Sequence, residues 1–100
     1  MNIHYFGEPY SFTHVAALKR FGKSNKYCSC RTISETIDSV REHSGDVCVV
    51  PIENTTGGVI LDTVDILLSQ NYLESNITIA EELELSIRLY LAAKKHIALS

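Results

Sequence analysis

The chain has 100 residues and a formal net charge of −3, with 45% hydrophobic and 21% charged residues. This composition fits one small folded domain, or one lobe of a larger domain, and argues against a disordered chain. The mild acidity and the absence of a clustered Lys/Arg stripe argue against a nucleic-acid-binding protein.

No targeting or membrane-spanning segment is predicted. The first residues lack a basic segment followed by a long apolar stretch, and no run approaches the roughly 20 apolar residues that span a bilayer. We therefore expect a cytoplasmic protein without a membrane partner. Three cysteines, Cys28, Cys30 and Cys48, fit neither a zinc knuckle nor a Cys-x-x-Cys pair, so we expect reduced, buried thiols.

The first third of the chain predicts a strand, a helix and a second strand. An apolar run over residues 3–6 ends in a Gly/Pro turn, which is typical of a short strand. Ser11 and Thr13 are both plausible N-caps for the following helix, which should end at Gly22. Residues 26–30 then predict a weaker strand.

The middle of the chain predicts a helix and a central strand. Thr32 and Glu35 have the spacing of a capping box, and apolar residues recur at helical spacing until Gly45. Residues 47–50 are all apolar, too few for an amphipathic helix and without a polar face. They therefore predict a central strand of a parallel sheet.

The last third predicts a third helix and further strands. The buried stripe of this helix is expected to consist of Ile60, Val64, Leu67 and Leu68, with Asp62 near its start. Residues 77–80 predict a short strand. Strict alternation over residues 83–91 predicts one long strand that extends beyond the sheet and would expose apolar surface or unpaired edges.

Alternating strands and helices predict an α/β fold with three layers and a mostly parallel sheet. Ligand sites in such sheets lie just past the carboxyl ends of the strands. Glu53 and Asn54 fall at such a point, before a loop of small and hydroxyl residues. An ordinary turn is an equally good interpretation of this segment when it is taken alone.

Two segments resemble motifs of the prephenate dehydratases. Residues 7–17, Gly-Glu-Pro-Tyr-Ser-Phe-Thr-His-Val-Ala-Ala, resemble the family's Gly-Pro-x-Gly-Thr-Tyr-Ser-x-x-Ala-Ala. Residues 50–55, Val-Pro-Ile-Glu-Asn-Thr, resemble its Val-Pro-Ile-Glu-Asn-Ser. The chain departs from these motifs at Glu8 and Tyr10, which replace proline and glycine, and at Thr55, which replaces serine.

The resemblance implies a particular domain organisation. The family's catalytic domain has two α/β lobes, similar to a type 2 periplasmic binding protein, and is roughly twice as long as this chain. We expect residues 1–100 to be the amino-terminal lobe, with its core in residues 1–80 and a crossover strand in residues 81–100. The family's Thr-Arg-Phe motif would lie in the other lobe. A truncated segment, or the product of a split or decayed gene, would account for the length.

The resemblance also implies an activity, the conversion of prephenate to phenylpyruvate with loss of carbon dioxide and water in phenylalanine biosynthesis. The reaction requires no metal and no organic cofactor. Glu53 would orient the ring hydroxyl or donate a proton, and Asn54 would bind the substrate as a neutral donor and acceptor. Ser11 and Thr55 would add hydroxyls to the substrate site. Local roles in capping a helix or closing a turn are the alternatives.

Other interpretations stay open at the level of sequence. His14 falls in a variable position of the motif and has no acidic partner at metal-ligand spacing, so we do not predict a catalytic role for it. A non-catalytic module that binds a small acid, or that mediates dimerisation, is the alternative function. We also expect a homo-oligomer, most simply a dimer.

Overall fold

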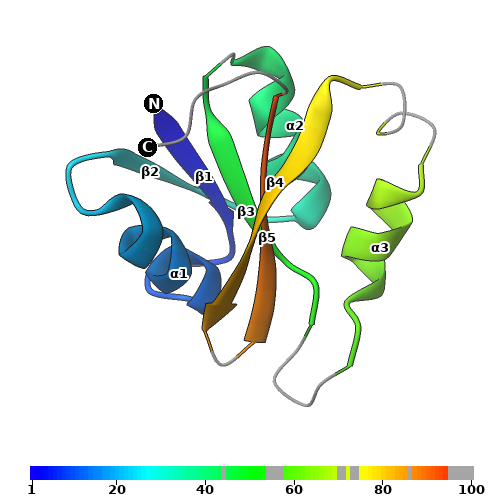
Figure 1. The fold of residues 1–100 in the computed structure, drawn as a ribbon, viewed down its shortest axis with the longest axis horizontal. Helices are drawn as coiled ribbons and strands as arrows, with labels where there is room; N and C mark the ends of the chain where they lie inside the picture. Colours follow the sequence, from blue (N-terminus) through cyan, green and yellow to red (C-terminus); the bar gives the residue numbers. More distant parts are fainter. Residues whose placement is uncertain (44, 54–57, 70–71, 73–74, 86, 95–100) are drawn as a thin grey trace.

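The computed structural model describes residues 1–43, 45–53, 58–69, 72, 75–85 and 87–94. These residues form a five-stranded sheet and three helices (Figure 1). In chain order, the elements are β1 Asn2–Phe6, α1 Phe12–Phe21, β2 Lys26–Cys30, α2 Ile33–Glu42, β3 Val47–Pro51, α3 Leu61–Leu67, β4 Ile77–Leu85 and β5 Ile87–Lys94. The first five elements confirm the elements predicted from the sequence.

The strand order is β2-β1-β3-β5-β4. Strand β1 pairs in parallel with β2 and β3, while β5 pairs antiparallel with β3 and β4. Among the described strands, only β5 therefore runs against the others. The predicted α/β fold with a mostly parallel sheet is confirmed, with the addition of one reversed strand.

Helices cover both faces of the sheet, as the three-layer prediction requires (Figure 1). The step from β1 to β2 moves one way along the sheet, and the step from β2 to β3 moves back past β1. Two crossovers of the same hand must then lie on opposite faces. Accordingly, α1 packs on one face, and α2 packs on the other with α3 beside it.

The core consists of two apolar clusters separated by the sheet. The α1 cluster contains Ile3, Ala16, Ala17, Val47, Val49, Leu89, Leu91 and Ala93. The α2 cluster contains Ile33, Ile37, Val40, Cys48, Val50, Ile77 and Ala92. Successive residues of β3 alternate between the clusters, and all five residues of β3 are buried. This explains the uninterrupted apolar run in the sequence.

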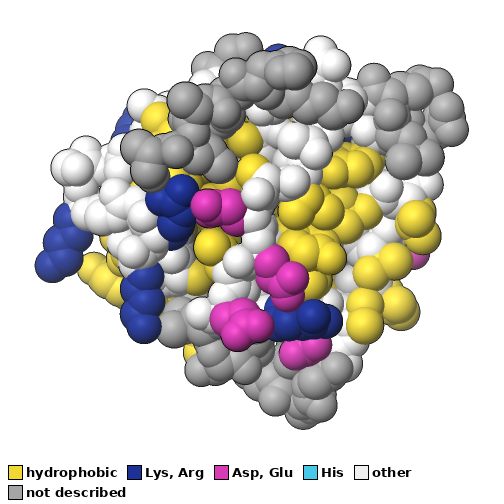
Figure 2. All heavy atoms as spheres, viewed as in Figure 1, with side chains coloured by type: hydrophobic (Ala, Val, Ile, Leu, Met, Phe, Trp, Pro, Cys, Tyr) yellow, Lys and Arg dark blue, Asp and Glu magenta, His cyan; other side chains and the backbone are white. Residues whose placement is uncertain are grey.

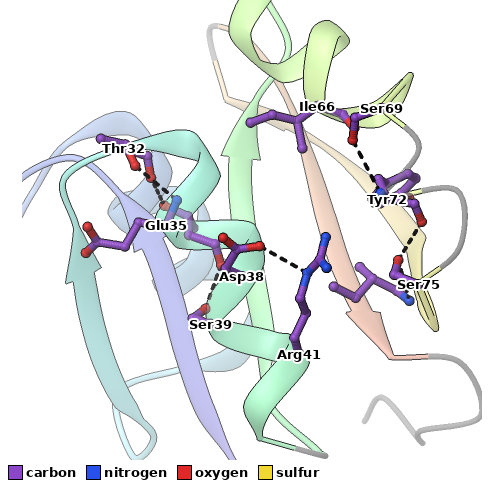
Figure 3. Close-up of polar contacts among 11 residues, drawn as sticks. Thr32, Glu35, Asp38, Ser39, Arg41, Ile66, Ser69, Tyr72 and Ser75 are labelled. Atoms are coloured by element: carbon purple, nitrogen blue, oxygen red, sulfur yellow. Dashed lines mark hydrogen bonds and ion pairs between the residues drawn. The ribbon is translucent and has the colours of Figure 1, made fainter.

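The helix ends follow the predicted signals. Ser11 occupies the N-cap position of α1, and Gly22 ends the helix with φ +81°. At the start of α2, the Thr32 Oγ1 atom accepts the Glu35 backbone N–H at 3.0 Å. Figure 3 shows this cap, and further along the helix it shows Arg41 directed toward Asp38.

The predicted long strand over residues 83–91 is wrong. The chain reverses between Leu85 and Ile87, and Leu83 pairs with Leu89. Because residues of the same parity face each other across this turn, the hydrophobic alternation continues through it unchanged. The sequence around the reversal also lacks a Gly or Asn turn signal. The alternation of apolar and polar residues therefore could not distinguish one long strand from this hairpin.

Strand β4 also changes the face that it buries. Its register with β5 shifts between Ile79 and Glu81. As a result Ile77 belongs to the α2 cluster, while Leu83 packs against the α1 cluster. Residues 81–94 thus contribute to the same sheet as the earlier strands, and the predicted division near residue 80 stays a prediction.

The predicted buried stripe of α3 is only partly correct. Leu68 is 72% exposed, whereas Thr63 is fully buried. The Thr63 hydroxyl donates a hydrogen bond to the Pro51 carbonyl oxygen at 2.6 Å. This bond fixes α3 against the end of β3, in an orientation that leaves Leu61 and Leu68 facing outward.

The cysteines are free, and Cys30 and Cys48 are buried as predicted, while Cys28 is half-buried. Burial raises the pKa of the Cys48 thiol to about 12. This thiol is therefore protonated at neutral pH and packs as an apolar group.

Candidate functional site

The carboxyl ends of β1, β2 and β3 meet at one edge of the sheet, because these three strands are parallel. The segment 7–11 follows β1, Arg31 follows β2, and Glu53 follows β3. The two sequence segments with recognisable motifs therefore lie at the same edge. This is where open α/β sheets place their ligand sites.

Glu53 is held by backbone pairing and by an ion pair. It forms an isolated antiparallel bridge with Val59, so the loop that begins at Glu53 returns to the end of β3. One carboxylate oxygen lies 3.2 Å from Arg88 Nε, and the side chain is 27% exposed. A carboxylate that is partly open to solvent remains accessible to a ligand at this edge.

Arg88 links two carboxylates. Its Nη1 atom lies 3.3 Å from Glu82 Oε1, in addition to the contact with Glu53. In Figure 2, acidic side chains flank a basic one near the tip of the β4–β5 hairpin. Arg88 therefore connects Glu53, which follows β3, to Glu82 of β4. The sequence analysis missed Arg88, because the hairpin that brings it to Glu53 was predicted as a single strand.

Ser11 lies at the start of α1, but its side chain does not cap the helix. Its Oγ atom lies 3.1 Å from Thr13 Oγ1 and 3.5 Å from the Phe6 carbonyl oxygen. A Cβ atom on Gly7 would lie 3.3 Å from Ser11 Oγ, so the hydroxyl packs closely against this glycine. The half-buried hydroxyl is near the end of β1, and its predicted contact with a substrate stays a prediction.

The remaining predicted site residues, Asn54 and Thr55, lie outside the described residues. Of the four, the structure therefore places Ser11 and Glu53, which follow adjacent strands. The Ser11 hydroxyl contacts Thr13 and Phe6, whereas the Glu53 carboxylate contacts Arg88, so the two side chains have separate partners.

Two hollows lie near these residues. One, of about 300 Å³, is lined by Gly7, Glu8, Pro9, Ser29, Cys30 and Arg31. The other, of about 250 Å³, lies between α3 and the hairpin and is lined by Ile52, Val59, Val64, Leu67, Leu68, Arg88 and Tyr90. The first hollow adjoins the end of β1, and the cationic side chain of Arg31 is part of its lining. The lining of the second hollow is mainly apolar.

His14 is not a metal ligand or an ion-pair partner in the described part of the chain. Its Nδ1 atom accepts the Tyr10 backbone N–H at 2.7 Å, and its ring stacks on Tyr5 at 4.3 Å. Among the described residues, no group of three or more His, Cys, Asp or Glu side chains is arranged to hold a metal ion.

No helix in the described ranges has the length and apolar character needed to cross a membrane.

Comparison with known sequences decides the family. The sequence model described as "Prephenate dehydratase" matches residues 3–100. The chain belongs to the prephenate dehydratase family. A bifunctional chorismate mutase/prephenate dehydratase from Aquifex aeolicus is 40% identical over 91 residues, which are 91% of this chain and 24% of that protein. A prephenate dehydratase from Bacillus subtilis is 33% identical over 73 residues, 73% of this chain and 26% of that protein.

Solved structures agree with this prephenate dehydratase assignment. The X-ray structure of prephenate dehydratase from Streptococcus mutans superposes with a TM-score of 0.79 and 26% identity, covering 99% of this chain and 52% of that chain. A quorum quenching acylase, GqqA, has a TM-score of 0.72 at 19% identity and covers 99% of this chain and 50% of that chain. This second similarity shows the fold alone.

The chain spans about a quarter of the length of the curated prephenate dehydratases that it matches. It spans about half of the solved chains. The matched region is thus part of a longer protein in these relatives, and the fold described above corresponds to that part.

Proposed function

We propose that this chain supplies one side of the substrate site of a prephenate dehydratase, the amino-terminal lobe of a two-lobed catalytic domain. The proposed reaction converts prephenate to phenylpyruvate with loss of carbon dioxide and water. The proposal rests above all on the position of Glu53, which lies within the motif of residues 50–55, just past the carboxyl end of the buried strand β3.

The chemistry assigns a role to each residue. Prephenate carries two carboxylates and a ring hydroxyl, and aromatisation of the ring drives the reaction. The enzyme must assist departure of the hydroxyl and hold the departing carboxylate. We propose that Glu53 contacts the ring hydroxyl, that Asn54 hydrogen-bonds the substrate, and that Ser11 and Thr55 bind its polar groups.

Arg88 supports the proposed role of Glu53. A lone carboxylate beside a dianionic substrate would be repelled, but the ion pair at 3.2 Å compensates part of the Glu53 charge. The contact also restricts the side-chain rotamers of Glu53, which favours a defined position for proton transfer or hydrogen bonding.

The first experiment is an NMR titration of the 100-residue chain with prephenate. We expect saturable shifts of the Ser11 and Glu53 amide signals, and an approximately tenfold weaker affinity for Glu53→Gln, because a charged hydrogen-bond partner is lost. Glu84→Gln is the matched control, since Glu84 is an exposed carboxylate on β4. Equal weakening by both variants, or no saturable shift, would contradict the proposed site.

A turnover assay separates binding from catalysis. Prephenate conversion is followed at neutral to mildly basic pH, where the acid-driven background reaction is slow. Binding without turnover is expected if the second lobe supplies essential groups. Turnover that Glu53→Gln abolishes would instead mean that these 100 residues contain a complete site, contrary to the proposed division into two lobes.

We further propose a cytoplasmic homo-oligomer, most simply a dimer. Val59, Leu61 and Leu68 support self-association, because each of these apolar side chains is more than half exposed. Figure 2 shows hydrophobic side chains gathered between the hairpin and α3, and Val59 and Leu68 line the hollow in this region. A non-catalytic module that binds a small acid or dimerises is the alternative, and it predicts no turnover even when this chain is joined to the second lobe of a prephenate dehydratase.

A further inference from the structure

The backbone of Tyr10 adopts an unusual conformation. Tyr10 has φ +68°, and it is the only non-glycine residue with positive φ in the described part of the chain. The left-handed region is unfavourable for a residue with a Cβ atom, by about 1 kcal/mol or more. A local interaction must therefore stabilise the turn formed by residues 7–11, which we call the 7–11 turn.

His14 supplies that interaction from the first turn of α1. Its Nδ1 atom accepts the Tyr10 backbone N–H at 2.7 Å, and the Tyr10 ring lies 5.4 Å from the imidazole. The Ser11 backbone N–H donates to the Glu8 carbonyl oxygen at 3.1 Å, which closes the same turn. At the start of the turn, the Gly7 backbone N–H donates to the Cys30 carbonyl oxygen of β2 at 2.9 Å. The bond at Tyr10, by contrast, depends on a histidine side chain.

The imidazole itself is fixed by the sheet. It stacks on Tyr5 of β1 with a centroid distance of 4.3 Å and an interplanar angle of 5°, and Tyr27 of β2 lies at 5.5 Å. Tyr5 is only 3% exposed, so the surface beneath the ring belongs to the rigid core. His14 therefore connects the core to the 7–11 turn.

We propose that His14 is a positioning residue whose neutral imidazole holds the 7–11 turn, and that protonation of Nδ1 releases this turn. In neutral imidazole, a nitrogen without hydrogen is an acceptor, but both nitrogens of the cation are donors. A protonated Nδ1 would face the Tyr10 N–H donor to donor. The hydrogen bond would then be replaced by repulsion.

The side chains that surround the His14 ring do not change their charge in mildly acidic solution. The rings that contact the imidazole in the described part of the chain are those of Tyr5, Tyr10 and Tyr27, and Glu8 is the charged residue of the 7–11 turn. Burial raises the pKa of Tyr5 and of Tyr27 above the usual 10.0, so both phenols stay neutral at and below neutral pH.

The consequence for the substrate rests on the proposed function. Gly7, Glu8 and Pro9 form one wall of the 300 Å³ hollow, and Tyr10 connects this wall to Ser11. Release of the 7–11 turn would move this wall and the Ser11 hydroxyl. Weaker prephenate binding in acid is therefore expected, in addition to any titration of Glu53 or of the substrate.

Amide hydrogen exchange at Tyr10 tests the hydrogen bond directly, with rates corrected for the intrinsic effect of pH. We expect the protection factor of the Tyr10 amide to fall about tenfold as His14 becomes protonated, with His14 titration followed by its own NMR signals. His14→Phe retains the stacking ring but no acceptor, so its Tyr10 amide should be unprotected at every pH. His14→Gln retains an acceptor that does not titrate, so it should restore protection and abolish the pH step.

His43→Phe is the matched control, because His43 is an exposed histidine at the end of α2 and has no contact with the 7–11 turn. Wild-type protection in His14→Phe, or a pH step that persists in His14→Gln, would overturn the proposal. A normal pH step without any prephenate binding would contradict the proposed function instead. Prephenate binding that His14→Phe leaves unchanged would overturn the positioning role.

Discussion

Tyr10 shows how a single residue can depart from its family without losing the local structure. The family motif has glycine at this position, and the observed φ of +68° explains why glycine is favoured there. The tyrosine ring is 81% exposed and lies against His14, so it does not fill the hollow beside Gly7. Tyrosine at this position therefore strains the backbone but does not block the hollow.

Tyr10→Gly should increase the free energy of unfolding by about 0.5–1 kcal/mol, because relief of the left-handed strain exceeds the added entropy of the unfolded chain. Urea denaturation at neutral pH measures the change. Tyr10→Ala is the control, since it removes the ring but retains the Cβ atom, and it should give no gain. A similar gain in both variants would show that loss of the ring, not the backbone, is responsible.

Asp46 is expected to make the stability of the chain depend on pH. Its Oδ2 atom lies 3.0 Å from His4 Nε2, and its Oδ1 atom accepts the Asn2 backbone N–H at 2.9 Å. Burial alone would raise the pKa of Asp46, but the hydrogen bonds from His4 and Asn2 bring it below the usual 3.8. The carboxylate thereby ties the starts of β1 and β3 together.

Because the pKa of Asp46 is lower in the folded chain, its contribution to stability is present above pH 3.8 and is lost as the pH falls through the folded value. Asp46→Asn should reduce the free energy of unfolding by about 1–2 kcal/mol at pH 7, and the two proteins should converge in acid. Urea denaturation across pH measures this. Asp38→Asn is the control, because the Asp38 side chain is 58% exposed in its ion pair with Arg41, and it should change the free energy of unfolding little. A difference that is constant with pH would contradict the assignment.

At the scale of elements, α3 is attached to the sheet by a polar contact as much as by apolar packing. Its stripe of apolar residues is divided, since Leu67 is half-buried and Leu68 is exposed. Thr63 is fully buried and bonds the last carbonyl of β3. A hydrophobic-periodicity argument gives no weight to threonine, which is why the predicted stripe was shifted.

Thr63→Val keeps the shape of the side chain but leaves the Pro51 carbonyl oxygen without its hydroxyl donor. We expect a loss of about 1–2 kcal/mol in the free energy of unfolding. Hydrogen exchange should show reduced protection of the α3 amides, while the α2 amides serve as an internal control. Uniform loss across both helices would show that Thr63 supports the whole fold instead of the position of α3.

The edge strand β4 is protected against uncontrolled pairing. It carries Glu81, Glu82 and Glu84, and its register shift interrupts a regular ladder. Arg20 binds Glu81 through two contacts of 2.7 and 3.0 Å, which connects α1 to this strand. The hydrogen bond from Arg20 lowers the pKa of Glu81, so the edge stays charged at neutral pH. Self-association through this edge is therefore disfavoured.

At the scale of the whole molecule, the exposed apolar residues lie on a different surface, around α3. Leu61 and Leu68 are 68% and 72% exposed, and Val59 precedes them at 57%. Val59 and Leu68 line the apolar hollow between α3 and the hairpin, and Leu61 is the first residue of α3. Burial of such a surface would favour association of two copies by the hydrophobic effect.

Light scattering coupled to size exclusion, across a concentration series, tests the proposed dimer. The Leu61→Lys/Leu68→Lys double variant should be monomeric at concentrations where the unmodified chain is dimeric, because two charges would have to be desolvated at the interface. Phe12→Lys is the control, since Phe12 is also exposed but belongs to α1. A monomeric unmodified chain at every concentration would contradict the proposed dimer.

Local signals were sufficient for the elements from β1 to β3. Their strands and helices are bounded by glycines, a proline and N-caps within a few residues, so neighbouring side chains determine them. The α/β fold, the position of Glu53 at a strand end and the family motifs could also be predicted, because each depends on contiguous sequence.

Only the tertiary structure decided which distant groups meet. In the hairpin, odd-numbered residues face odd-numbered residues, so the alternation of apolar and polar residues does not reveal where the chain reverses. The contact between Arg88 and Glu53, 35 positions apart, depends on that reversal and could not be predicted either. The rotation of α3 depends on a hydroxyl and a carbonyl 12 positions apart. The bond from Tyr10 to His14 spans only four positions, but it depends on a left-handed turn that tyrosine would not adopt by itself. Propensity and periodicity describe neighbours along the chain, whereas these features depend on partners that folding brings together.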